Sequence, residues 1–314
     1  MNPIFNKIII IGLGLIGGSL AIAIRKNNLS KTILAYNRTK NTINFALKNK
    51  IIDGEFNFDQ NLTKNDLIII ATPLFAYQEI FQKIKVNNYQ CLITDIGSVK
   101  KYPEDLYFKI FQEKNHFIPS HPIAGKESRG IKNSEVELFL NKRVILTKFC
   151  QNKENIEKIK QLWQKIGSKI SILDAKEHDE IFCLISHLPQ YISFKFKEKR
   201  DNNLPEILKK HLRIENSNPA MWQEIFILNK DNLDKYYKIF EENYEKLQKI
   251  SEKNLKIIAK QLNLNNFEQM TISNQEFFNQ RLKIIIAFLQ IEDVLKYSEF
   301  AGSGFKDFTS VFSS

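Results

Sequence analysis

The sequence predicts an α/β protein, with an N-terminal doubly wound parallel sheet followed by an all-α C-terminal domain. Short β-branched apolar runs alternate with helix-spaced segments in the first part of the chain, and a glycine-rich turn follows the first run. Strand-like runs end near Asp174, and long segments rich in Lys, Glu, Leu and Ile follow. We therefore place the two domains at 1–173 and 174–314.

The first domain alternates predicted strands and helices. Continuous apolar runs are typical of strands that are buried on both faces of a parallel sheet. The expected strands, all in one layer, are 7–12, 31–36, 66–73, 91–97, 116–120, 142–148 and 169–174. The expected helices include 17–28, 39–49, 75–85 and 153–167. In the second domain we expect helical segments over 175–199, 219–262 and 273–297.

Composition restricts the class of protein. A chain of 314 residues with 43% hydrophobic and 26% charged residues is typical of globular domains. No run approaches the roughly 20 apolar residues that span a bilayer, and no export leader is recognisable, so we expect a cytoplasmic protein without a membrane partner. The three cysteines are far apart. They predict neither a disulfide framework nor a metal site.

The net charge of +11 raises the question of nucleic acid binding. The lysines are interleaved with Glu, Asn and Ile rather than gathered in one block, which is typical of solvated faces. No aromatic and basic recognition motif accompanies them, so we expect no nucleic-acid partner. A nucleic-acid binder attracted by charge alone stays the distant alternative. The charge is compatible with attraction of an anionic small molecule.

A glycine-rich turn directly follows the first predicted strand. In "IIIIGLGLIGGSLA", Gly12, Gly14 and Gly17 form the pattern G-x-G-x-x-G at the start of a helix. Gly12 permits the tight turn, Gly14 lets the backbone approach a pyrophosphate, and Gly17 allows close helix–strand packing. This context predicts a Rossmann-type, dinucleotide-binding domain. The alternative is a glycine-rich turn that binds nothing.

The residue expected to contact the ribose favours one dinucleotide. About 20 residues after the last glycine, NAD enzymes place Asp or Glu, whereas this chain has Asn37 followed by Arg38. A guanidinium can grip a 2′-phosphate, so we expect NAD(P)+ with NADP+ slightly favoured. Arg38 could instead be a solvated residue before a helix capped by Thr39. The expected cofactor-binding residues are Gly12, Gly14, Leu15, Ile16, Gly17, Asn37, Arg38, Thr39, Thr72 and Pro73.

Two of the five histidines lie in similar settings, His121 in the expected loop "PSHPIAGKESRG" and His187 in "ISHLPQ". A neutral imidazole has the pKa of a general base near pH 7, and ligands of doubly wound sheets bind at the carboxyl ends of the strands. His121 is therefore a candidate base for oxidising an alcohol. The alternative is that both histidines are structural.

Several segments in both domains resemble one family. They are "GLGLIGGSLA", "ATP", "DIGSVK", "SHPIAGKESRG", "HDEIFCLISHLPQ", "NPAMWQEIF" and "AGSGFKDFT". Together they resemble the prephenate/arogenate dehydrogenases of tyrosine biosynthesis. The resemblance implies oxidative decarboxylation of prephenate to 4-hydroxyphenylpyruvate with hydride transfer to NAD(P)+, or the same reaction of arogenate. It also implies a homodimer formed through the helical domain.

The resemblance assigns roles to the site residues. His121 would take the proton of the substrate hydroxyl, Ser98 would orient His121, and His187 would contact the substrate. Glu127 would act near the pocket entrance. The expected catalytic residues are thus His121, Ser98 and His187, and the expected substrate-binding residues are Glu127, Lys306, Trp222 and Arg129.

The chain departs from the family in two respects. Ser310 stands where the family has the arginine that holds the ring carboxylate, so Lys306, Arg129 or Arg143 would have to replace it. The segment "AGSGFKDFTSVFSS" ends the chain, whereas in the family it directly precedes the segment that begins here at Asn218. The helical domain is therefore expected to be permuted in segment order. Exchange of segments between two protomers and a catalytically impaired nucleotide-binding homologue are the alternatives. We expect the apolar helix over 280–297 to be buried.

Overall fold

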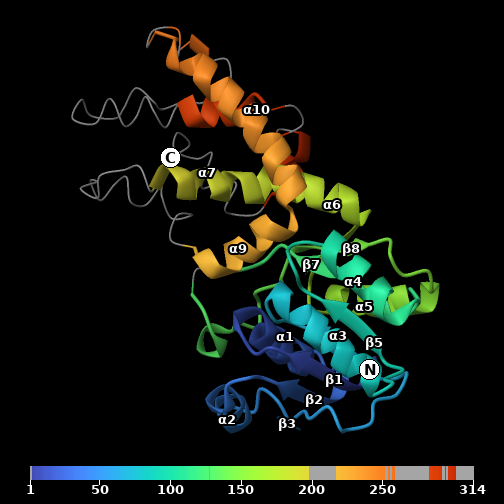
Figure 1. Ribbon diagram of the computed structural model, residues 1–314. Helices are drawn as coiled ribbons and strands as arrows, with labels where there is room; N and C mark the ends of the chain where they lie inside the picture. The colour runs from blue at the N-terminus through green and yellow to red at the C-terminus, as the bar shows by residue number, and fades with distance from the viewer. Residues whose placement is uncertain are drawn as a thin grey trace. The chain divides into compact units, whose positions relative to one another are not determined.

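The chain divides into two compact units, Met1–Asp179 and Glu180–Ser314. The computed structural model describes residues 2–126, 128–197, 217–251, 254, 257–258, 283–291, 294 and 296–301. The first unit contains parallel strands that alternate with helices, and the second is helical throughout its described part (Figure 1). The predicted fold class, an α/β domain followed by a helical one, is confirmed.

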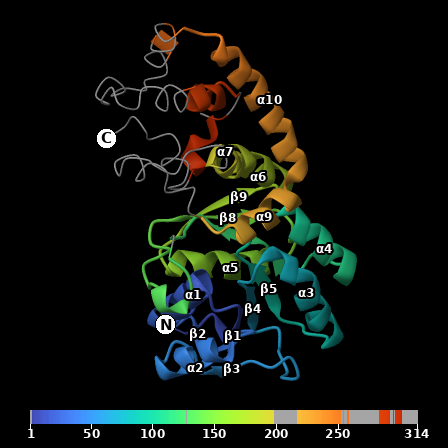
Figure 2. The same cartoon turned by 60° about the vertical axis from the view of Figure 1, so that its left-hand side comes forward.

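The first unit is built on a parallel sheet of six strands in the order β3-β2-β1-β4-β5-β6. The strands are β1 (Phe5–Ile11), β2 (Ser30–Tyr36), β3 (Gly54–Glu55), β4 (Leu67–Ile70), β5 (Leu92–Asp95) and β6 (Phe117–Ile118), most of which are labelled in Figure 2. Five of them fall in predicted runs, and only the two-residue β3 was missed. The strand order reverses between β1 and β4, and ligands of doubly wound folds bind at such a switch point.

Helices cover both faces of this sheet. They are α1 (Leu15–Lys26), α2 (Lys40–Lys48), α3 (Tyr77–Val86), α4 (Lys101–Phe111) and α5 (Lys153–Lys165). Successive side chains of a strand point to opposite faces. Ile8 and Ile10 of β1 belong to a core cluster with residues of α1, α2 and α5. Rings of α3 and α4 form a separate aromatic cluster in which Phe81 contacts Tyr107.

A second, three-stranded sheet contains β7 (Ser120–Pro122), β8 (Arg143–Thr147) and β9 (Lys169–Leu173). We expected 142–148 and 169–174 to extend the first layer, and this is wrong. Pro119 has no amide hydrogen and interrupts the run predicted as one strand over 116–120. The chain leaves the first sheet there, and β7 pairs with β8 in antiparallel fashion. His121 therefore lies on a short strand and not in a loop.

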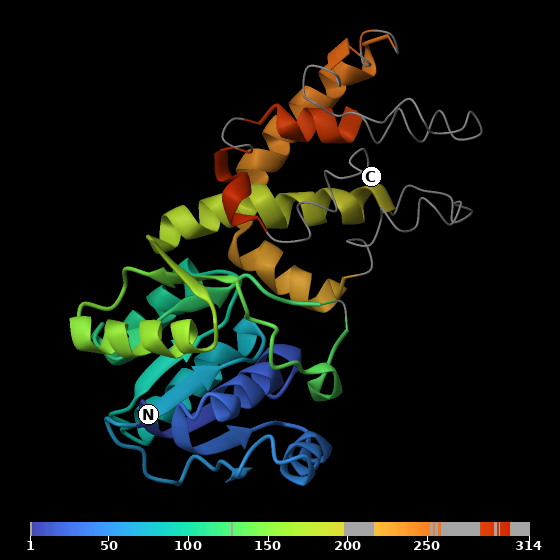
Figure 3. The ribbon, with the colours of Figure 1, turned by 180° about the vertical axis from the view of Figure 1, so that it is seen from behind.

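The second unit is helical where the structure describes it. Its elements are α6 (Ala175–Phe182), which begins in the first unit, a π-helical turn η3 (Cys183–His187), α7 (Leu188–Lys197), α9 (Pro219–Leu228), α10 (Lys230–Gln248) and the 3₁₀ helix η7 (Lys296–Phe300). The long α10 is orange in Figure 3. None of the described helices is long and apolar enough to cross a membrane.

The apolar segment near the end of the chain is buried as expected. Ile285, Ile286 and Phe288 are fully buried, and Asn243 of α10 donates a hydrogen bond to the carbonyl of Ala287. Among the described residues the α-helix there covers 283–289, and it ends at 289 rather than at the predicted 297. Residues 261–282 lie outside the described residues, as does the segment 302–314 on which the expected permutation depends.

Candidate active site

The glycine turn lies at the end of β1, beside the switch point. Gly12 has φ +103°, and a Cβ there would stand 2.6 Å from the carbonyl oxygen of Ala71. A Cβ on Gly17 would stand 2.0 Å from the carbonyl oxygen of Gly12. A Cβ on Gly14 would meet no atom within 4 Å. Two of the glycines are thus required by the protein itself, whereas the space above Gly14 is open.

Side chains from the neighbouring strand ends complete this region. Thr72 follows β4, and its buried hydroxyl oxygen has no hydrogen-bond partner among the described residues. Asn37 follows β2, and its Oδ1 accepts a hydrogen bond of 3.0 Å from the amide of Leu13 in the glycine turn. Arg38 and Thr39 are exposed, and Thr39 precedes α2 without a side-chain capping bond. Asn37 therefore braces the turn, a role that the sequence did not suggest.

These features fit a dinucleotide. The first amides of α1, including those of Leu15 and Ile16, have no carbonyl partner within their own helix and point out of its N-terminus. The open space above Gly14 adjoins them, and the Thr72 hydroxyl beside Gly12 can still accept or donate a hydrogen bond. A pyrophosphate placed there would be bound by backbone amides at the positive end of a helix dipole.

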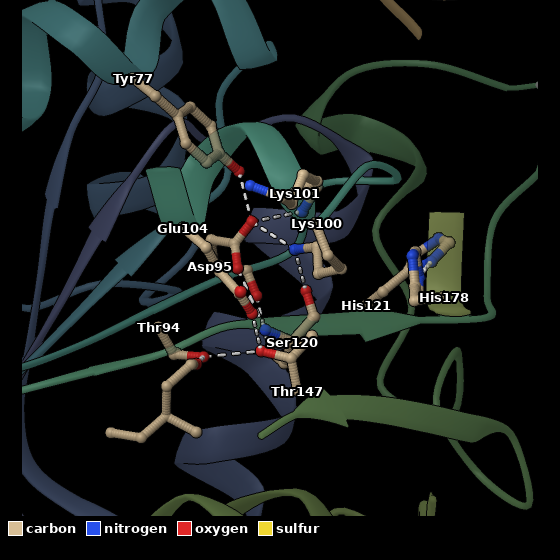
Figure 4. A network of polar contacts seen from close by, with 12 residues as sticks. Tyr77, Thr94, Asp95, Lys100, Lys101, Glu104, Ser120, His121, Thr147 and His178 are labelled. Atoms are coloured by element: carbon tan, nitrogen blue, oxygen red, sulfur yellow. Dashed lines mark hydrogen bonds and ion pairs between the residues drawn. The ribbon is translucent and has the colours of Figure 1, made fainter. Parts of the chain in front are cut away.

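A buried polar network lies at the end of β5 (Figure 4). The Asp95 carboxylate is 2.6 Å from the Lys100 ammonium, and both side chains are fully buried. Asp95 also accepts hydrogen bonds from the Tyr77 hydroxyl and from the amides of Gly97 and Ser120. Lys100 donates in addition to the Ser120 carbonyl at 2.8 Å. The network ties the ends of β5 and β7 together, which fixes the backbone next to His121.

Burial shifts the pKa of two charged groups in this region, Lys100 and Glu104. Desolvation lowers the pKa of Lys100, and nearby Asp95 opposes the shift. Desolvation raises the pKa of Glu104 to about 7, against the hydrogen bond from the Thr147 hydroxyl and the charge of Lys100. Glu104 is therefore a carboxyl group that titrates near neutral pH inside the first unit.

His121 follows Ser120 of this network on β7, and its ring contacts a second imidazole. Its side chain is 9% exposed, and its Nδ1 is 2.9 Å from Nε2 of His178 on α6. The rings of the two residues are seen together in Figure 4. Nδ1 of His178 is 2.8 Å from the Asp179 carboxylate, which in turn accepts hydrogen bonds from the amides of Lys100 and Lys101. Burial lowers the pKa of His178 well below its usual value.

The other predicted residues of the first unit are more dispersed. Ser98 is half-buried after β5, and no described hydrogen bond joins it to His121. Arg129 is exposed. The segment after Arg129 packs on α1, because the amide of Glu135 donates to the Ser19 hydroxyl at 2.9 Å. Glu127 and Lys306 lie outside the described residues.

The second unit presents its own imidazole. His187, 1% exposed, lies in the π-helical turn, and such turns are frequent at functional sites. Nδ2 of Asn229 is 3.0 Å from Nδ1 of His187. Because an amide nitrogen can only donate, Nδ1 of His187 accepts and its Nε2 carries the hydrogen. The Trp222 ring lies edge-on to His187, with a centroid distance of 6.1 Å.

Three contacting residues were missed by sequence reasoning: His178, Asp179 and Asn229. The signal for the first two was the adjacent pair in "KEHDE", at the start of a predicted helix, in a chain with five histidines. Nothing in the sequence relates them to His121, which lies 57 residues earlier. Asn229 ends an apolar helix, where an asparagine is an ordinary capping residue, so it carried no signal.

The fold and the glycine turn define the class: this is a Rossmann-type domain of the kind that binds a dinucleotide. Comparison with known proteins specifies the family. Residues 20–172 match the family described as "Prephenate dehydrogenase, nucleotide-binding domain", and residues 174–264 match "Prephenate dehydrogenase, dimerization domain". The chain belongs to the prephenate dehydrogenase family, as the resemblance of its motifs predicted.

Individual relatives agree with this assignment. The chain is 31% identical over 247 residues to the prephenate dehydrogenase of Bacillus subtilis, covering 74% of this chain and 67% of that protein. It is 32% identical to that of Lactococcus lactis, covering 71% and 65%. The crystal structure of prephenate dehydrogenase from A. aeolicus in complex with hydroxyphenyl propionate and NAD+ superposes with a TM-score of 0.70 at 27% identity, covering 78% and 90%. The chain thus spans about two thirds of the length of the two sequence relatives.

Proposed function

We propose that this protein catalyses the oxidative decarboxylation of prephenate to 4-hydroxyphenylpyruvate, with NAD(P)+ as the hydride acceptor. The observation that carries the proposal is the nearly buried imidazole of His121. It lies on β7, which directly follows the last strand of the six-stranded sheet, in a chain that belongs to the prephenate dehydrogenase family. The choice of prephenate as the substrate is supported by the similarity to the prephenate dehydrogenases of Bacillus subtilis and Lactococcus lactis.

The bound nicotinamide ring supplies the hydride acceptor. His121 takes the proton of the hydroxyl on ring carbon C4 as the C4–H bond breaks. The ring carboxylate leaves as carbon dioxide, and the electron pair of that bond makes the ring aromatic. His121 then returns the proton to the phenolate oxygen. One prephenate and one NAD(P)+ therefore yield one 4-hydroxyphenylpyruvate, one carbon dioxide and one NAD(P)H.

The remaining predicted residues hold the dianionic substrate. His187 donates from Nε2 to a substrate oxygen, because Asn229 occupies its other nitrogen. The indole of Trp222 packs near that imidazole, and Arg129 and Lys306 supply positive charge. From the resemblance to the family, Glu127 is assigned a role near the pocket entrance, and Ser98 is assigned a contact with the substrate. Charged hydrogen bonds of this kind contribute about 1.5–3 kcal/mol each.

The cofactor is held by the glycine turn, with Gly12, Gly14 and Gly17 shaping it and the first amides of α1, at Leu15 and Ile16, receiving the pyrophosphate. Thr72 and Pro73 border the nicotinamide side. Exposed Arg38, next to Thr39, favours the 2′-phosphate of NADP+, and Asn37 adds no repelling carboxylate. The helical domain forms a homodimer, as its match to a dimerization domain supports.

The proposal is tested by steady-state turnover of the purified full chain with prephenate or arogenate and with NAD+ or NADP+. We expect reduced nicotinamide and carbon dioxide in equal amounts with prephenate, and a higher kcat/KM with NADP+. Turnover of arogenate alone would assign the related activity. Binding of the cofactor, seen as a thermal shift, without turnover of either substrate would show a catalytically impaired homologue and overturn the proposal.

A further inference from the structure

We propose that His178 and Asp179 are positioning residues that hold His121 in the tautomer with hydrogen on Nδ1 and a lone pair on Nε2. Resting on the proposed function, this inference says which nitrogen of His121 acts as the base. The three residues form one hydrogen-bonded chain with nitrogen–nitrogen and nitrogen–oxygen distances of 2.9 and 2.8 Å.

This hydrogen-bonded chain starts at the carboxylate of Asp179, which is held in place by backbone amides. Oδ1 of Asp179 accepts from the amide of Lys100 at 2.7 Å, and Oδ2 accepts from the amide of Lys101 at 2.9 Å. These amides stand at the N-terminus of α4, where the helix dipole stabilises negative charge. Two amide donors and a helix terminus favour the ionised carboxylate, so Asp179 only accepts hydrogen bonds.

The direction of the remaining bonds follows. Nδ1 of His178 faces this carboxylate and must donate to it. His178 is fully buried, and its pKa is lowered by desolvation and by the charge of Lys100, so the ring is neutral and its Nε2 carries the lone pair. That lone pair faces Nδ1 of His121 and accepts its hydrogen. Neutral His121 therefore keeps its own lone pair on Nε2.

The same hydrogen-bonded chain also stabilises His121 once it is protonated. When Nε2 of His121 takes the substrate proton, the imidazolium still donates from Nδ1 to His178. The Asp179 carboxylate at the far end stabilises the new positive charge. A carboxylate that orients a catalytic imidazole without being protonated is well known in hydrolases. Here a second imidazole stands between the carboxylate and the base.

A purely structural role is the competing explanation, because Asp179 also binds the amides at the start of α4. Substitutions of His178 separate the two roles, since they leave those amide bonds in place. Glutamine at 178 offers an amide hydrogen to Asp179 and an oxygen to His121, so His178→Gln can preserve the chain. His178→Leu fills similar space and breaks it.

The test combines nitrogen-15 NMR of the histidine rings in the full chain with the pH profile of kcat/KM for prephenate. We expect His121 in the parent protein to carry hydrogen on Nδ1. We expect His178→Gln to keep that tautomer and remain within about tenfold of the parent in kcat. His178→Leu should shift the ring towards the Nε2–H tautomer and lower kcat about 100-fold. The acidic limb of its pH profile should move to lower pH, because the imidazolium loses its acceptor.

Thermal unfolding of the three proteins serves as the control for structural damage. Hydrogen on Nε2 of His121 in the parent would overturn the proposal, as would unchanged kcat and pH profile in His178→Leu. The NMR experiment needs no substrate. An absence of turnover in the parent would therefore overturn the proposed function, while the position of the hydrogen on His121 would still decide this inference.

Discussion

Replacing single glycines of the turn by alanine should separate two effects. A methyl group at Gly17 should lower stability, whereas a methyl group at Gly14 should lower cofactor affinity. In Gly17→Ala the new Cβ would stand 2.0 Å from a backbone oxygen, so α1 and the turn must separate. Such overpacking costs about 1–3 kcal/mol, and each kcal/mol lowers Tm by roughly 2–4 °C in domains of 150–250 residues. In Gly14→Ala the Cβ meets no protein atom within 4 Å.

Gly14→Ala should therefore change stability little. Gly14 precedes α1 with φ −80° and ψ −161°, which alanine can adopt. Alanine is a poorer N-cap than glycine by about 0.5–1 kcal/mol. Alanine also lowers the conformational entropy of the unfolded chain, which offsets about as much. The methyl group would, however, occupy the space expected for the pyrophosphate. Losing one charged amide–phosphate hydrogen bond costs about 1.5–3 kcal/mol, or roughly 10- to 150-fold in affinity.

The assay is calorimetric titration of NAD+ and NADP+ into the parent and Gly14→Ala, with thermal unfolding of both variants without cofactor. We expect Gly14→Ala to unfold within about 3 °C of the parent and to bind at least tenfold more weakly. Gly17→Ala should unfold at a clearly lower temperature. Equal cofactor affinity in Gly14→Ala would refute the assignment of the open space to the pyrophosphate.

Three further predictions concern the same unit. Because the pKa of Glu104 is raised to about 7 from 4.5 by burial, the folded state binds its proton more tightly than the unfolded state. The contribution of Glu104 to the free energy of unfolding is thus greatest below about pH 4.5 and is lost as the pH rises to about 7. The loss is on the order of 3 kcal/mol. Thermal unfolding at pH 5 and pH 8 should show a smaller decrease in Glu104→Gln than in the parent, and equal decreases would contradict the assignment. Lys100→Met should cost about 3–5 kcal/mol in urea unfolding by leaving Asp95 buried and unpaired, whereas the double variant with Asp95→Asn should recover part of it. A neutral effect of Lys100→Met would show that the pair is dispensable. Asn37→Asp keeps an oxygen for the amide of Leu13 and adds a charge that repels a 2′-phosphate. It should lower kcat/KM for NADP+ relative to NAD+ about tenfold, and an unchanged ratio would place the 2′-phosphate elsewhere.

The fold could be predicted because its signals are local. Runs such as "KIIIIG" are apolar throughout, as strands covered on both faces must be, and the glycine turn follows one of them directly. The second sheet could not be foreseen, since one residue, Pro119, decides that the chain leaves the first layer. Helix α4 was also missed. Its Pro103 lies in the first turn, where proline is tolerated because the amide there has no partner within the helix.

The candidate site was predicted only in part. The glycines and His121 lie in short sequence motifs that indicate their roles, so each of them could be predicted from its neighbours in the sequence. The contacts between His121, His178 and Asp179 depend on how α6 packs against β7 and α4, and that packing has no local signal. The same holds for the hydrogen bond that Asn37 accepts from the amide of Leu13 in the glycine turn.

The central claim is that the imidazole of His121 removes the proton of an alcohol while a nicotinamide takes the hydride. Its most direct test is the rate of NAD(P)H formation in a single turnover of prephenate by the parent and by His121→Asn, with cofactor affinity measured alongside. We expect the variant to bind the cofactor as the parent does and to react about 100- to 10,000-fold more slowly. An equal rate in His121→Asn would contradict the account.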